Sequence, residues 1–138
     1  MKRILPLLLV VALFLALASP TSAATVDPVQ PCFIYIDAVD LQLLINENTG
    51  IAYCQATCDA GSGVTIVLTG ILQQYKNGRW NDVKSWVSTG SMFVSISKQW
   101  AVYSGYQYRF NVTAKIYNSS GTLLESDTSS VSYYYPGT

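Results

Sequence analysis

The chain has 138 residues, with eight Lys and Arg, eight Asp and Glu and no histidine, so its formal net charge is zero. Half of the residues are hydrophobic and no basic cluster occurs, which argues against nucleic-acid binding and against electrostatic adsorption to anionic membranes. The lack of histidine excludes Ser-His-Asp and Cys-His catalysis and most zinc hydrolases.

The N-terminus has the pattern of a secretory signal peptide. A basic start is followed by an apolar run from Ile4 to Ala18, and small residues then offer a cleavage site after Ala23 or Ala24. The apolar run is shorter than the roughly 20 residues that a transmembrane helix needs. We therefore expect a secreted, extracellular protein with no membrane span after cleavage. The expected division is a signal peptide at 1–24, a linker at 25–31 and one domain at 32–138.

The remainder of the chain has hydrophobic residues at a period of two, which is typical of half-buried β-strands. Turn signals rich in Gly, Asn and Ser separate these stretches. The expected strands are residues 33–45, 51–59, 64–76, 79–87, 92–102, 106–117 and 122–134. This spacing predicts an all-β fold, a seven-strand antiparallel two-sheet sandwich. The expected core contains Ile66, Leu68, Leu72, Val83, Ile96, Tyr108, Phe110 and Val112.

An odd number of cysteines leaves one thiol without a partner in an oxidising compartment. Cys54 and Cys58 are four residues apart in one strand, about 13 Å, which is too far for a disulfide. If strands 33–45 and 51–59 pair around the turn at 46–50, Cys58 faces position 38 and is nearer to Cys32. We expect a Cys32–Cys58 disulfide and a buried free thiol at Cys54; the alternative is no disulfide. With no histidine and one close cysteine pair, we expect no metal site and no cofactor.

The stretch from Leu72 to Trp86, LQQYKNGRWNDVKSW, predicts a β-hairpin. Asn77 and Gly78 both tolerate the positive φ that a type I′ turn requires. The resulting register pairs Tyr75 with Trp80, and it extends by regular pairing to Gln73–Asp82, Ile71–Lys84 and Thr69–Trp86. It places Leu72 and Val83 on the core side and five candidate ligand-binding residues on the outer side: Tyr75, Trp80, Asp82, Lys84 and Trp86.

Aromatic rings interleaved with polar side chains are suited to carbohydrate, because sugar C–H faces stack on rings while hydroxyls bond to polar groups. A Tyr–Trp cross-strand pair also stabilises a sheet without any ligand, by about 0.2–1 kcal/mol. Both interpretations of the hairpin stay open at this point.

Carboxylates are the only remaining catalytic candidates. Glu47 lies in a turn signal, and Glu125 and Asp127 share one face of a strand, a spacing that a retaining glycosidase could use. Such pairs are more typical of edge-strand charges that prevent aggregation. We therefore expect a protein that is not an enzyme.

The segment from Val102 to Tyr108 resembles the approach to the sixth strand of fibronectin type III and immunoglobulin-like domains. This resemblance implies a tyrosine corner, in which the Tyr108 hydroxyl bonds to the backbone of the preceding loop. Antibody domains have a second disulfide cysteine two residues after this tyrosine, where this chain has Phe110. The chain is therefore closer to the fibronectin type III pattern.

The hairpin pattern LQ-Y-NG-W-V-SW, the GY-YR strand and the terminal G-E-S strand resemble a group of small secreted proteins of Gram-positive bacteria. The resemblance implies an extracellular fibronectin-like β domain without assigned activity or functional residues; the cysteines depart from it. We expect a secreted or cell-surface interaction module that contacts a glycan or protein at the cell surface. The alternatives are a carbohydrate- or cell-wall-binding module and a purely structural domain.

Overall fold

The computed structural model describes residues 33–137, and within them it contains seven β-strands and no helix. The signal-peptide and linker predictions and Cys32 lie outside these residues. The strands are β1 (Ile36–Asn46), β2 (Ile51–Ala60), β3 (Thr65–Lys76), β4 (Arg79–Gly90), β5 (Phe93–Ala101), β6 (Tyr106–Tyr117) and β7 (Leu123–Tyr135). The expected strands match these bounds to within three residues.

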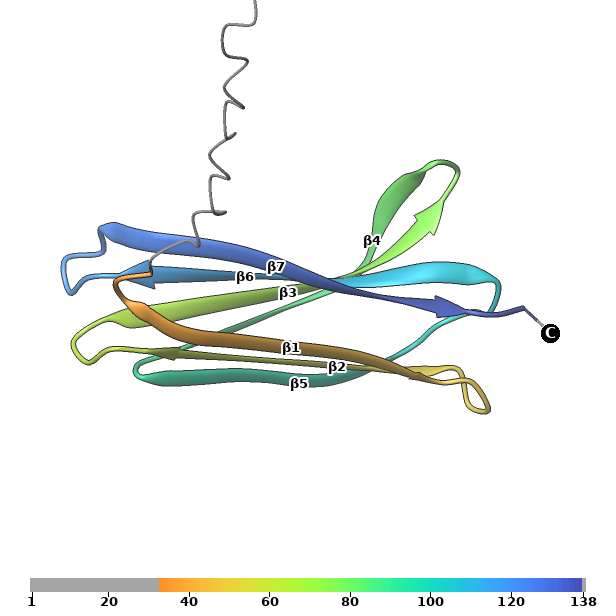
Figure 1. Cartoon of the computed structure of the whole chain (residues 1–138), viewed down its shortest axis with the longest axis horizontal. Helices are drawn as coiled ribbons and strands as arrows, with labels where there is room; N and C mark the ends of the chain where they lie inside the picture. The colour runs from red at the N-terminus through yellow and green to blue at the C-terminus, as the bar shows by residue number, and fades with distance from the viewer. Residues whose placement is uncertain (1–32, 138) are drawn as a thin grey trace, which may run out of the picture. The chain divides into compact units, whose positions relative to one another are not determined.

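The strands form two antiparallel sheets, with the orders β1-β2-β5 and β4-β3-β6-β7. Figure 1 shows the two sheets as separate layers, with the β3–β4 hairpin bending away from the three-stranded sheet. One hydrophobic core draws on strands of both sheets. The prediction of seven antiparallel strands in two sheets is confirmed.

The core combines small side chains on the central strand β2 with larger ones on its neighbours and on the other sheet. The inward side chains of β2 are all Ala or Cys, whereas β3 and β6 contribute Ile66, Leu68, Leu72, Tyr108 and Phe110. At Gly70 an added Cβ would lie 2.6 Å from Cζ of Phe110, so the phenyl ring occupies the space that a side chain would need. Of the expected core residues only Val83 is not fully buried; it packs partly buried against the core.

The register of the β1–β2 hairpin differs by one residue from the predicted one. Val39 pairs with Cys58 and Leu43 with Cys54, where positions 38 and 42 were expected. The reason is the turn: the Asn46 carbonyl accepts a hydrogen bond from Gly50 N at 2.8 Å, so Asn46 ends β1 and the loop has four residues instead of five.

The expected Cys32–Cys58 disulfide is not formed, because Cys58 has a free thiol. Its side chain is fully buried on the inner face of the central strand β2, between Val39 of β1 and Val94 of β5. Cys54 is a buried free thiol, as predicted. Burial raises the pKa of Cys54 to about 12; burial and then the charges of Asp59, Asp127 and Asp37 raise that of Cys58 to about 11. Both thiols are therefore protonated and poorly nucleophilic at neutral pH.

Candidate functional site

The tip of the β3–β4 hairpin has the predicted geometry. Asn77 and Gly78 have φ values of 56° and 75°, as a type I′ turn requires. Tyr75 pairs with Trp80 and Gln73 with Asp82, in the predicted register. This end of the hairpin therefore places the side chains of Tyr75, Trp80 and Asp82 together on the outer face.

A β-bulge changes the register beyond Gln73. Val83 is the extra residue, so that Lys84 pairs with Leu72 and Trp86 with Gly70 instead of with Ile71 and Thr69. Because a shift of one residue moves a side chain to the other face of a sheet, Lys84 and Trp86 turn to the inner side. The prediction that Trp86 and Lys84 share the outer face with Trp80 is wrong.

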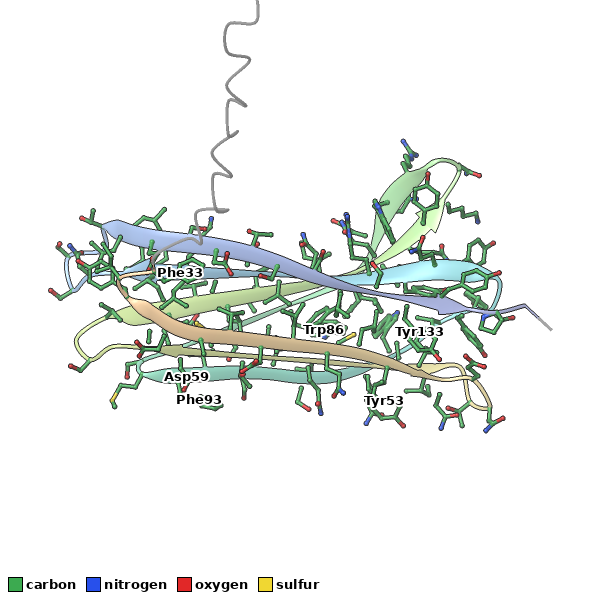
Figure 2. All side chains as sticks on the ribbon, in the orientation of Figure 1. Phe33, Tyr53, Asp59, Trp86, Phe93 and Tyr133 are labelled. Carbon is green, nitrogen blue, oxygen red and sulfur yellow. The ribbon has the colours of Figure 1, made fainter. Side chains whose placement is uncertain are left out.

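Trp86 is part of the packing between the sheets. Its ring lies edge-on to Phe110, with centroids 6.4 Å apart, above the position where Gly70 has no side chain. Figure 2 shows Trp86 between the two layers. A contiguous exposed platform of Trp80 and Trp86 is therefore absent.

Five side chains on the outer face form a connected group that we call the outer cluster: Gln73, Tyr75, Trp80, Asp82 and Arg109. The Arg109 guanidinium lies 4.3 Å from the Trp80 ring centroid and donates from Nε and Nη2 to Gln73 Oε1 at 2.9 and 2.7 Å. Gln73 Nε2 in turn donates to Asp82 Oδ1 at 2.7 Å. Tyr75 packs on Trp80 with ring centroids 5.2 Å apart.

Sequence reasoning missed Arg109 as a member of this site. The alternation of 106–117 did place it on the polar face of its strand, but only the register of β3 with β6, which sets Gln73 opposite Arg109, brings it to the hairpin. A pairing between strands more than 30 residues apart has no local sequence signal. The hairpin and the sixth strand therefore form one surface.

Register extends the outer cluster across all four strands of its sheet. Tyr75 is opposite Gln107, and Gln107 is opposite Tyr134 of β7, so Trp80, Tyr75, Gln107 and Tyr134 form one row. Tyr75 and Tyr134 are 43% and 62% exposed, while Trp80 is partly buried. An aromatic row thus lies beside a polar row of Asp82, Gln73, Arg109 and Ser132.

On the inner side, the bulge leaves a cleft between β4 and β5. Lys84 Nζ lies 4.5 Å from the Trp100 ring centroid across this opening. The cleft has a volume of about 320 Å³. Its lining residues are Gln74, Val83, Trp100, Ala101, Val102, Tyr103 and Tyr108.

The Tyr108 hydroxyl forms the hydrogen bond that the sequence resemblance implied. It donates to Tyr103 O at 2.8 Å and accepts from Tyr103 N at 3.0 Å and from Gln74 Nε2 at 2.9 Å. One donor and two acceptor positions are thereby all used. Burial raises the pKa of Tyr108, although the hydrogen bonds that the phenol oxygen accepts from Gln74 Nε2 and Tyr103 N oppose the shift. This phenol fixes the loop before β6.

The two glutamates of the chain both bind the β1–β2 sheet to β7. The Glu125 carboxylate accepts hydrogen bonds from the backbone N–H groups of Ile34, Tyr35 and Ile36 at 3.1, 2.8 and 2.9 Å. Partial desolvation raises its pKa, but these three donors outweigh it and hold the pKa below its usual value. At the other end, Tyr133 and Tyr135 donate to Glu47 at its Oε1 and its backbone O.

Within residues 33–137, no group of three or more metal-ligating side chains occurs. The described residues also include no helix with the length and hydropathy of a membrane span. Comparison of the chain with protein-family models, curated proteins and solved structures gives no match.

Proposed function

We propose that this protein is a secreted or cell-surface interaction module without catalytic activity, and that its contact surface is the outer face of the β4-β3-β6-β7 sheet around the outer cluster. The observation that carries the proposal is the aromatic row, which crosses four strands with aromatic side chains from β4, β3 and β7 and Gln107 from β6; both of its tyrosines are exposed beside hydrogen-bonding side chains. Exposed aromatic side chains with polar neighbours are typical of contact surfaces.

The fibronectin type III arrangement is part of this proposal. The fourth strand pairs with β3 in the sheet of β6 and β7, whereas in constant immunoglobulin domains it joins the sheet of the first two strands. The Tyr108 hydroxyl bonded to the loop before β6 also agrees with a tyrosine corner. Domains of this architecture commonly serve as contact modules at cell surfaces, although the fold alone does not define a function.

The non-catalytic part of the proposal is supported by the carboxylates that the sequence offered for catalysis, Glu47, Glu125 and Asp127, all of which accept hydrogen bonds. Glu125 and the Glu47 side chain accept hydrogen bonds that join the two sheets. Asp82 accepts from Gln73, and Asp127 accepts from Ser129 Oγ at 3.2 Å. A general acid and a nucleophile would have to be free to reach a substrate.

Carbohydrate is the ligand class that the aromatic row favours. Tyr75 and Tyr134 present ring surface, while Gln107 between them supplies both a donor and an acceptor for hydroxyl groups. The contrasting case, a purely structural domain, has its own supporting observation. Trp80 is held between Arg109 and Tyr75, which would stabilise the sheet without any ligand.

One experiment separates these three cases. Intact cell walls, peptidoglycan and a glycan array are incubated with the wild type, Tyr75→Ala, Tyr134→Ala and a matched control, Val87→Ala. Val87 lies on β4 and is exposed on the same outer face of the sheet as the two tyrosines. An interaction module loses cell-wall retention in the two tyrosine variants while both stay folded, with no greater loss of stability than the about 0.2–1 kcal/mol of the Tyr75–Trp80 pair, and the control retains it.

The outcomes differ in what they overturn. Binding to purified glycan, lost in both tyrosine variants, supports the carbohydrate version, and a blank array with retained cell-wall binding leaves a protein partner. If neither cell walls nor glycans retain the wild type, and Trp80→Ala only lowers stability, the domain is structural and the proposal fails.

A further inference from the structure

Within residues 33–137, the two sheets leave four strand edges unpaired, namely those of β1, β5, β4 and β7. An unpaired edge presents backbone N–H and C=O groups that can add another strand. Natural sheets block such edges with bulges, inward-pointing charges, short strands or covering segments.

Three of the four edges carry such a device. The edge strand β4 has the bulge at Val83. A register shift between Ile36 and Ala38 interrupts β1, where Asp37 is exposed. The short strand β5 has a charged residue, Lys98, at an inner-row position opposite Cys54.

The backbone edge of β7 has a covering segment only in its first part; near its other end, Tyr133 and Tyr135 reach Glu47 with their hydroxyl groups from the inner face. Glu125 holds the backbone of Ile34–Ile36 beside it, and Asp127 is partly buried on the inner face. The following segment, Thr128–Tyr135, has the sequence TSSVSYYY, without charge, Gly or Pro, and its pairing with β6 is regular. Among the described residues, β7 forms backbone hydrogen bonds only on its β6 side.

We propose that Thr128–Tyr135 is the pairing edge of a homodimer, in which β7 of a second copy adds antiparallel and joins the two four-stranded sheets. The segment is complementary to itself. In a two-fold arrangement centred on Val131, Ser130 is opposite Ser132 of the second copy and Thr128 is opposite Tyr134 of the second copy.

This arrangement creates no conflict of charge or of face. Antiparallel pairing about a two-fold axis normal to the sheet keeps outer residues opposite outer residues, and Ser–Ser and Thr–Tyr pairs are favourable cross-strand neighbours. Asp127 is then opposite Tyr135 of the second copy, so like charges do not meet. An uncharged edge gains nothing from a charged foreign strand, whereas the identical strand matches it in charge and in face.

The test uses light scattering on the purified protein as its concentration is raised. The wild type is expected to form a dimer. The dimer dissociation constant of the S130K/S132K variant is expected to rise by at least about tenfold, because lysines then face each other across the new pair. The S130E/S132E variant is weakened likewise, and an equimolar mixture with S130K/S132K restores the dimer. Both substituted positions, Ser130 and Ser132, are exposed on the outer face, so the β6–β7 ladder is kept.

The control S85K/V87K places the same charges on exposed outer positions of β4 and is expected to remain dimeric. Circular dichroism checks that every variant is folded. A wild type that stays monomeric at the highest concentrations, a dimer insensitive to S130K/S132K, or equal weakening in the β4 control would each overturn the proposal. Strand addition by a different protein would give a monomer in this assay and is thereby distinguished.

Discussion

The two open sides of the sandwich, where the edge strands of the sheets approach each other, are held by different kinds of contact. On the β1–β7 side, Glu125 and Glu47 make directional hydrogen bonds near both ends of the strands. On the β4–β5 side, the contact between the sheets is that of Lys84 with Trp100, and a cleft of about 320 Å³ lies beside it; Trp86 packs on Phe110 of its own sheet. Figure 1 shows β4 diverging from β5 toward the hairpin tip.

The difference shows that the two edge strands of one sheet can have different roles. β7 holds the two sheets together, while β4 presents side chains to solvent. Carboxylate acceptors on consecutive backbone N–H groups allow little movement, since each bond depends on angle as well as distance. Ring contacts are less directional and tolerate the splaying that the Val83 bulge introduces. The hairpin can therefore lean away from the core, so that the outer cluster lies on a part of the sheet with few constraints from β5.

The largest expected effect comes from filling the space below Trp86. Gly70→Ala would place a Cβ 2.6 Å from Phe110 Cζ and 3.3 Å from Ile96 Cδ1, so the phenyl ring must move against Trp86. Overpacking of this kind costs about 1–3 kcal/mol of unfolding free energy. Chemical denaturation measures it, with Gly61→Ala as the control, because nothing lies within 4 Å of the Cβ there. Equal stability of the two variants would contradict the packing described for Gly70.

The next effect concerns the β1–β7 side. Glu125→Ala leaves three backbone N–H groups without their acceptor, which we expect to cost about 1–2 kcal/mol after allowance for solvent around this half-exposed group. Glu125→Gln keeps an acceptor oxygen and should cost less. Denaturation of both variants beside the wild type gives the two values.

The pH dependence of the same carboxylate has a definite sign. Its folded-state pKa is lowered from 4.5, so the stability that it contributes is present above about pH 4.5 and is lost as the pH falls through the folded value. The difference in unfolding free energy between wild type and Glu125→Gln should therefore shrink on acidification below pH 4.5. A difference that grows on acidification would contradict the role given to Glu125.

Sequence periodicity was sufficient for the strands, because alternation of core and polar residues is a local property. It also located the type I′ turn and the near-tip pairs of Tyr75 with Trp80 and of Gln73 with Asp82. Alternation along 106–117 correctly separated Phe110 and Val112 from the polar side chains of that strand.

The failures come from single-residue shifts and distant partners. One extra residue at Val83 reversed the faces of Lys84 and Trp86, and one residue fewer in the loop after Asn46 shifted the pairing of Cys58. The residue pattern of each hairpin is also compatible with a regular ladder. Val83, for example, is apolar and suits the inner face with or without the bulge. The contacts of Glu125 with Ile34–Ile36 span about 90 residues of sequence and have no periodic signal at all.

The smallest expected effect is on the β4–β5 side. Lys84→Ala removes the ammonium that lies over Trp100, a contact worth about 0.5–1 kcal/mol at a partly exposed site. We expect this variant to lose a small amount of unfolding free energy and to change the emission of Trp100. We also expect its backbone amides to exchange faster along β4 than along β7. Lys115→Ala is the control, because Lys115 is exposed on the outer face of β6. If Lys84→Ala costs as much as Glu125→Ala, or if β7 rather than β4 exchanges faster, the contrast drawn between the two sides does not hold.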